Sequence, residues 1–227
     1  MHRRTSSRRR TALVLSATAL VAVPALTACG SDAHPGAAAV VGGQRITVSQ
    51  LETRVNEVRD AQQAATTDRA QYEEAIAKTG GLTRNTLHTM VLDRVLHRAA
   101  TDQGVTVTRK EMQDMRAGLE QQAGGAQQLE TAWLAQYSVP PKRLTESLRT
   151  EIEAQKLATA LGADMQTPEG QTAFWKTLGK ASKELNVDLN PRYGSWEITP
   201  RSRLVEAKTP WLKQVTQQQP AAAQQTA

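Results

Sequence analysis

The sequence predicts a mainly α-helical domain whose short β-strands come from the two ends of its folded part. Apolar residues recur at helical spacing in one segment after another, which is the pattern of amphipathic helices. The β-prone runs, in contrast, are confined to residues 38–46 and 187–198. The chain has 227 residues and a single cysteine. A buried apolar core must therefore hold the fold without an internal disulfide.

The N-terminus has the features of a bacterial lipoprotein signal. Five arginines and no acidic residue precede an apolar stretch, Ala12–Ala25, which leads into Leu26-Thr27-Ala28-Cys29. This is the lipobox pattern, in which cleavage falls between Ala28 and Cys29 and the cysteine carries diacylglycerol and an acyl chain. An ordinary secretory signal or a membrane-spanning anchor is the alternative, but the apolar run is shorter than the ~20 residues that a span needs. We expect residues 1–28 to be the signal peptide.

Charge and export signals define the expected compartment. The five arginines of the signal account for five of the six net positive charges, so the chain from Cys29 onward carries only +1. Basicity is then poor evidence for nucleic-acid binding, and no such partner is expected. We expect the protein on the extracytoplasmic face of the cell membrane, held by its lipid. Arg8-Arg9-Arg10 leaves twin-arginine export open, although the looser match of the following residues favours the general secretory route.

Composition divides the mature chain into a tether, a domain and an extension. Residues 29–37 are polar and broken by glycine and proline, which indicates a lipidated tether. The folded domain is expected over residues 38–200, and residues 201–227 form a C-terminal extension. Its end, Val215–Ala227, is nearly all Gln, Ala, Thr and Pro. We expect disorder there, because so few apolar side chains cannot offset the entropy lost on ordering.

The domain opens with a predicted hairpin and a helix. Ala38–Ile46 holds two β-prone pieces around Gly42-Gly43. Ser49 and Glu52 then have the spacing of a capping box, in which each side chain satisfies a free backbone amide at a helix start. The helical pattern assigns Leu51, Val55, Val58 and Ala65 to the inward face and Arg54, Glu57 and Arg59 to the outward face.

The strongest core element is predicted over residues 82–103, after a short polar helix at residues 70–78. Two adjoining apolar stripes cover a wide arc of this helix, so it should be largely buried. Gly104 ends it, and Thr108 with Glu111 forms a second capping box. The two stripes consist of Leu87, Val91 and Val95 and of Leu92, Leu96 and Ala99.

Two further helices carry the candidate peptide-binding residues. They are Met112, Met115 and Leu119 on one helix and Trp133 and Tyr137, in line with Leu129, on the next. Apolar stripes at this spacing usually form the core between two helices. Alternatively, methionine and aromatic side chains, which adapt in shape, line an open groove for unfolded chains. The sequence leaves both interpretations open.

The C-terminal half of the domain contains a helix with two apolar faces. The helix predicted over residues 141–163 carries its early leucines on one face and Leu157 and Leu161 on another, so its ends should contact different neighbours or the helix should kink. Thr167-Pro168-Glu169 starts a final helix. Two strands around a turn follow within Val187–Ile198, and we expect this segment to pack beside Ala38–Ile46.

The order of these elements resembles the N-terminal domain of SurA-type and PrsA-type extracytoplasmic folding factors. The resemblance rests on AAVVGGQRITVSQLETRV (38–55), NTLHTMVLDRVLHRAATDQGVTVTRKEM (85–112) and LAQYSVPPKRLTESLRTEIEAQKLATAL (134–161). VDLNPRYGSWEI (187–198) is similar to the closing segment of that family. The resemblance implies a helical chaperone domain with small β elements where the termini meet.

The chain departs from that family in lacking space for a parvulin-type prolyl isomerase domain. Only residues 162–167 separate the long helix from the last one, whereas such a domain needs about 100 residues. His34 lies in the tether, and His88 and His97 lie about 180° apart on one helix. Glu73-Glu74 and Glu151/Glu153 are expected on solvated helix faces. No metal-binding, nucleophile or phosphate-binding motif is visible, so no enzyme activity, cofactor, metal or small-molecule substrate is expected.

Together these features predict a membrane-anchored, non-catalytic chaperone-like lipoprotein that binds unfolded or exported polypeptides. The alternative is a structural or interaction lipoprotein that binds one dedicated envelope partner. A solute-binding lipoprotein fits poorly, since such proteins usually have two α/β lobes and a longer chain.

Overall fold

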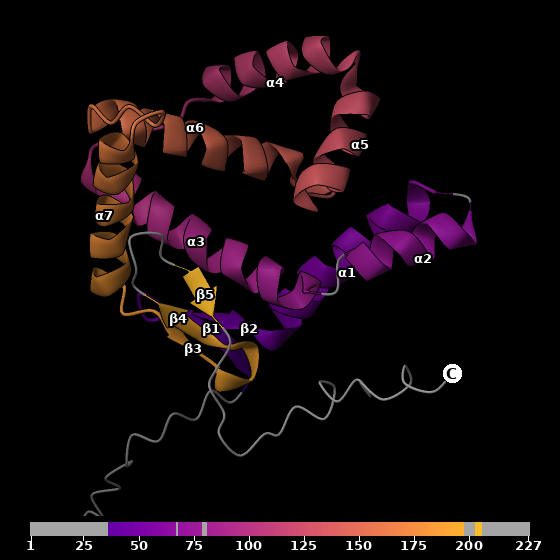
Figure 1. Ribbon diagram of the computed structural model, residues 1–227, viewed down its shortest axis with the longest axis horizontal. Helices are drawn as coiled ribbons and strands as arrows, with labels where there is room; N and C mark the ends of the chain where they lie inside the picture. Colours follow the sequence, from indigo (N-terminus) through magenta and orange to yellow (C-terminus); the bar gives the residue numbers. More distant parts are fainter. Residues whose placement is uncertain (1–35, 67, 79–80, 198–202, 206–227) are drawn as a thin grey trace, which may run out of the picture. The chain divides into compact units, whose positions relative to one another are not determined.

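The computed structural model describes residues 36–66, 68–78, 81–197 and 203–205, and within them the fold is mainly α-helical, as predicted. The signal peptide with Cys29, most of the tether, Ile198 and Val215–Ala227 lie outside the described residues. In the described part of the chain, no helix is both long enough and apolar enough to cross a bilayer. Figure 1 shows the element order.

The two ends of the domain meet in a three-stranded antiparallel sheet, which confirms their predicted pairing. Strand β1 (Ala37–Val41) pairs with β2 (Gln44–Thr47) through the turn Gly42-Gly43, whose φ angles of 60° and 74° suit glycine. On its other edge β1 pairs with β3 (Asp188–Leu189). Residue 37, expected in the tether, is thus already a buried part of the sheet.

Helix α1 (Val48–Ala64) begins two residues earlier than the sequence pattern suggested. Thr47 is the N-cap: its hydroxyl accepts from the backbone N–H of Gln50 at 3.0 Å, and the Gln50 side chain accepts from the Thr47 N–H at 2.9 Å. The expectation of a capping box at Ser49 and Glu52 was wrong. Strand β2 runs directly into the helix, so the earlier of two overlapping cap patterns is used. Helix α2 (Arg69–Lys78) follows.

Helix α3 (Leu82–Asp102) is the central element and packs against α1, α6 (Leu144–Ala160), α7 (Pro168–Glu184) and β1. Its stripe of Leu87, Val91 and Val95 is fully buried, as predicted. These side chains belong to the main core, a cluster of aliphatic residues from the sheet, α1, α3, α6 and α7. Of the adjoining stripe, Leu92 is only half-buried.

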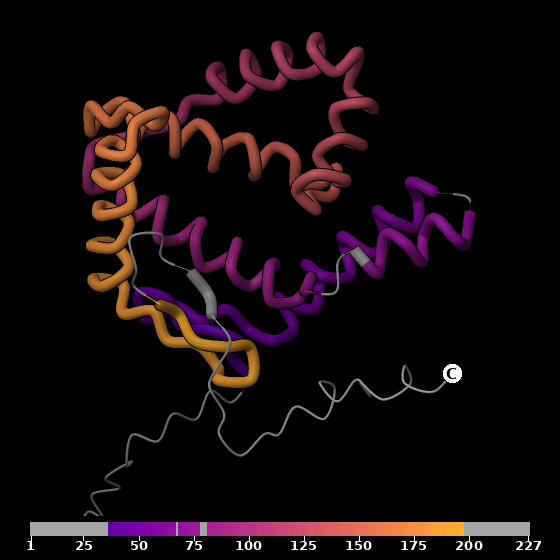
Figure 2. The backbone as a smooth tube through the Cα atoms, in the orientation of Figure 1, coloured from indigo at the N-terminus to yellow at the C-terminus, as the bar shows by residue number. Residues whose placement is uncertain are grey.

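A second, smaller cluster joins α4 (Arg109–Ala123), α5 (Ala126–Tyr137) and the first half of α6, which follows the 3₁₀ turn η1 (Pro141–Arg143). The chain runs out along α4, turns through α5 and returns along α6 (Figure 2). Leu144 and Leu148 belong to this cluster, whereas Leu157 belongs to the main core. This confirms that the two ends of α6 pack against different neighbours. The capping box of Thr108 and Glu111 at the start of α4 is also confirmed.

The two late strands and the turn between them are present as predicted, but the strands do not pair with each other. Strand β4 (Ser195–Glu197) does not pair with β3; its partner is β5 (Arg203–Val205), which falls in the expected extension. The 3₁₀ turn η2 (Pro191–Tyr193) separates β3 from β4. The Trp196 indole donates a 2.7 Å hydrogen bond to Ser182 on α7 and lies 5.6 Å from the His88 ring on α3, so β4 is held against these helices.

Candidate functional site

A cleft of about 720 Å³ lies between α3 and the α4–α5–α6 segment, with α1 and residues 138–140 at its border. A second hollow is lined by five residues of α5 alone and has no opposite wall. We therefore take the first as the candidate site, because five helices contribute to it. Its polar lining includes Asn85, Thr86, Thr89, Gln136, Ser147 and Thr150.

Four of the five predicted binding residues line this cleft. Met115 and Leu119 come from α4, and Trp133 and Tyr137 come from α5. Met112 is half-buried on α4 and lies outside the cleft lining. Tyr137 is 54% exposed, and no other large apolar side chain of the described residues is classed as exposed. The predicted stripe thus ends in an aromatic ring open to solvent.

The same side chains also support the second cluster. Met115, Leu119 and Trp133 are half-buried and pack against Leu129 and its buried neighbours on α6. The Trp133 indole donates a 3.2 Å hydrogen bond to Ser147 on α6, and its ring lies 5.2 Å from Tyr137. Each of these three residues therefore both packs on the cluster and lines the cleft, so their positions are compatible with the core and the groove interpretations.

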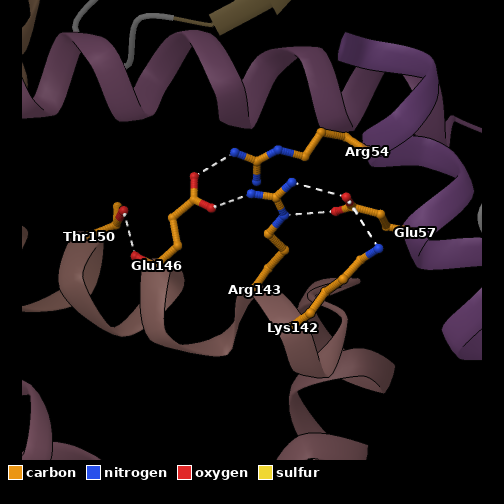
Figure 3. A network of polar contacts seen from close by, with 6 residues as sticks. All are labelled: Arg54, Glu57, Lys142, Arg143, Glu146 and Thr150. Carbon is orange, nitrogen blue, oxygen red and sulfur yellow. Dashed lines mark hydrogen bonds and ion pairs between the residues drawn. The ribbon is translucent and has the colours of Figure 1, made fainter. Parts of the chain in front are cut away.

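A buried carboxylate ties α1 to the start of α6 (Figure 3). Glu57, expected on an outward face, is only 7% exposed. Arg143 holds both of its oxygens, at 2.7 and 3.0 Å, and Lys142 approaches to 3.3 Å. The Arg143 hydrogen bonds lower the pKa of Glu57 and outweigh the opposing effect of its burial.

Glu146 connects this pair to α1 a second time. It accepts from Arg143 Nη1 at 3.0 Å and from the Arg54 guanidinium, so it lies between two arginines (Figure 3). Burial alone would raise the pKa of Glu146, but the bonds from Arg54 and Arg143 lower it. Both carboxylates thus stay ionised at neutral pH and bridge the border of the cleft.

Asp93 on α3 has the opposite electrostatic environment. Burial raises the pKa of Asp93 to about 6, and the negative charge of Glu146 adds to this effect. Arg54 and a hydrogen bond with Thr150 oppose the shift but do not cancel it. A carboxylate on the cleft wall therefore titrates near pH 6.

Comparison with protein families identifies the domain. Residues 3–158 match the model of the SurA-like N-terminal domain. The chain belongs to this family. Neither a curated protein nor a solved structure matches the chain. The family match ends within α6, so α7 and the late strands lie beyond it.

Membership of the SurA-like N-terminal domain family suggests a chaperone-type or periplasmic folding-related role. The family match overlaps the long stretch, residues 38–161, whose element order resembled SurA-type and PrsA-type factors. That resemblance is therefore confirmed for the N-terminal domain.

The two histidines of this SurA-like domain point to different neighbours. His88 lies beside Trp196, and His97 Nδ1 lies 3.1 Å from Glu153 on α6. Glu153 also accepts from Arg149 at 3.2 Å and is 6% exposed, so its expected position on a solvated face was wrong. Within the described ranges, no group of three or more His, Cys, Asp and Glu residues could hold a metal ion.

Several polar residues of the cleft were not singled out by the sequence patterns. Glu57 and its partner Arg143 are separated by 86 residues, so no local spacing links them. Asp93 did leave a signal: it follows Leu92 within a helix whose apolar arc is otherwise wide. A charged residue next to buried apolar positions is usually paired with an opposite charge or has a functional role.

Proposed function

We propose that this protein is a membrane-anchored, non-catalytic chaperone that binds unfolded or exported polypeptides outside the cytoplasm, with the α3–α6 cleft as its binding site. The observation that carries the proposal is the apolar wall of Met115, Leu119, Trp133 and the exposed Tyr137, set in a chain of the SurA-like N-terminal domain family. An exposed aromatic next to methionine suits many apolar side chains without selecting one shape.

The chemistry of the cleft suits an extended chain. Apolar side chains of a client would contact the α4–α5 wall, while its backbone amides and carbonyls need hydrogen-bond partners. The hydroxyl and amide groups of Thr86, Thr89 and Gln136 lie in the same lining. Binding of this kind is reversible and governed by mass action, so it requires no nucleotide.

The proposal contains no catalytic step. Helices α6 and α7 are joined by residues 161–167, which leave no room between them for the isomerase domain of related folding factors. Assays with proline-containing peptides should show the uncatalysed rate of cis–trans isomerisation. Turnover that follows the protein through purification would overturn this part of the proposal.

Anchoring is proposed through Cys29. Two lipid chains on one cysteine hold a protein at a membrane stably, whereas a single chain binds only marginally. Fractionation of Cys29→Ala should find the protein released from membranes, and the mass of the parent should show a lipidated Cys29 at its N-terminus. Unchanged membrane association of the variant would contradict the anchor.

The binding site is tested by aggregation of two unrelated unfolded proteins in the presence of the chain held in lipid nanodiscs. The parent should slow both at near-stoichiometric ratios. Tyr137→Ser should weaken this protection, whereas Tyr72→Ser, a matched change on α2 outside the cleft lining, should not. If the chain protects neither client but binds one envelope protein tightly, the dedicated-partner alternative replaces this proposal.

A further inference from the structure

The cleft contains an excess of negative charge. Four carboxylates line it against two guanidinium groups. The arginines are already engaged with two of the four acids, since Arg143 binds Glu57 and Glu146 and Arg54 binds Glu146. The four lining acids are Glu57, Asp93, Glu146 and Glu151, and the two bases are Arg54 and Arg143.

Asp93 differs from the other acids of the lining. No basic group of the described residues lies within ion-pair distance of it, and a hydrogen bond with Thr150 lowers its pKa only in part. Glu151, in comparison, is exposed and accepts from the Gln155 amide at 2.9 Å. Asp93 is half-buried beside Met90 and Leu92 on the same wall. A carboxylate in such surroundings gains more from an incoming cation than an exposed one does.

From this charge complementarity we infer that the cleft selects extended polypeptide segments in which a lysine or arginine adjoins aromatic or aliphatic side chains, with the cation placed on Asp93. The inference rests on the proposed function and specifies its substrate class. The apolar neighbours of the cation would contact Trp133 and Tyr137, which line the same cleft. Segments with an acidic residue at that place meet like charge and are disfavoured.

The selection should depend on pH through the carboxylate of Asp93. The charged groups that act on it are Arg54 from α1 and Glu146 and Glu153 from α6. Glu146 stays ionised because its pKa is lowered, and Arg54 stays charged. Glu153 lies 3.1 Å from His97 Nδ1 on α3. Since the pKa of Asp93 is about 6, its carboxylate is ionised at pH 7.5 and largely protonated at pH 5. The preference for cations should therefore disappear over that range.

Fluorescence anisotropy tests this with three labelled nonapeptides of sequence Gly-Ala-Phe-Leu-Xaa-Phe-Leu-Ala-Gly, in which Xaa is Lys, Gln or Glu. The chain is held in lipid nanodiscs, with empty nanodiscs as the blank. At pH 7.5 we expect the Lys peptide to bind about five- to tenfold more tightly than the Gln peptide, as a charge-assisted contact allows, and the Glu peptide to bind most weakly. At pH 5 the Lys and Gln peptides should bind alike.

The variants separate this inference from the function on which it rests. Asp93→Asn should lower the affinity of the Lys peptide to that of the Gln peptide, while Asp102→Asn, on the same helix outside the cleft lining, should keep the preference. If all three peptides bind equally and their binding still depends on Tyr137, the inferred selectivity is wrong but the proposed binding site is retained. A preference that persists in Asp93→Asn or at pH 5 would overturn it as well. No binding of any peptide would overturn both.

Discussion

The two halves of helix α6 show how one helix can close a core at one end and border a cleft at the other. Around Leu157 the helix packs into the main core with aliphatic side chains of α3 and α7. Around Leu148 it packs on the α4–α5 cluster, and ion pairs of Arg143 and Glu146 connect it to α1. Close aliphatic packing leaves no space, whereas long charged side chains bridge a gap. The cleft therefore lies beside the charged half.

The largest expected effect concerns the main core. Leu157→Ala should destabilise the whole domain by about 2–5 kcal/mol, because Leu157 is fully buried and its neighbours on several elements cannot all collapse into the cavity. Chemical denaturation measures this. In Leu148→Ala, hydrogen exchange should speed up mainly in α4 and α5. If both variants lose protection from hydrogen exchange equally in β1 and α7, the two halves of α6 do not differ in this way.

A smaller loss of stability is expected at the charged half of α6. Arg143→Leu should cost about 1–3 kcal/mol, because it leaves the buried Glu57 carboxylate with Lys142 as its only partner in the network of Figure 3. Lys142→Leu is the matched control and should cost less than about 1 kcal/mol, since that side chain is 59% exposed. Urea titrations of both variants decide this. A larger cost for Lys142 than for Arg143 would contradict the network.

The pH dependence of stability should have opposite signs at Asp93 and Glu57. The pKa of Asp93 is raised from 3.8 to about 6, so its ionisation opposes folding, and its contribution to stability is lost as pH rises from 3.8 to about 6 and then stays constant. Asp93→Asn should therefore stabilise the domain at pH 7.5, by about 1–3 kcal/mol, and have little effect near pH 3.5.

Glu57 is the control, because its effect on stability should change with pH in the opposite direction. Its pKa is lowered below 4.5, so its contribution is present above pH 4.5 and is lost as pH falls through the folded-state pKa. Glu57→Gln should destabilise the domain at pH 7.5, with a difference that shrinks below pH 4. Melting curves from pH 3 to 8 test both. Variants that respond to pH in the same direction would refute the assignment of the two environments.

Much of the fold could be predicted from the sequence because its signals are local. The Gly42-Gly43 turn, the Thr108 cap and the two faces of α6 each depend on residues within a few turns of one another. The start of α1 was misplaced, since two cap patterns overlap there and the path of β2 decides between them. Strand β5 was missed because three residues carry too little pattern.

The candidate site could be predicted only on its apolar side. Met115, Leu119, Trp133 and Tyr137 share helical spacing, and the structure places them along one cleft, whereas Met112 falls outside it. The polar side depends on contacts between distant segments, such as Arg54 with Glu146 and Arg143 with Glu57. Side-chain periodicity assigns Glu57 to the surface of an isolated helix; only the position of η1 beside α1 makes it buried.

The central claim, that unfolded chains bind in the cleft, is tested most directly by photo-crosslinking with p-benzoylphenylalanine placed at Tyr137. This ring is exposed, so the substitution should change the free energy of unfolding by less than about 0.5 kcal/mol. Upon irradiation, unfolded clients should become crosslinked at position 137 and not at Tyr72 on α2, and an excess of unlabelled client should suppress the product. Equal crosslinking at both positions, or none at position 137 while aggregation is still slowed, would contradict the account.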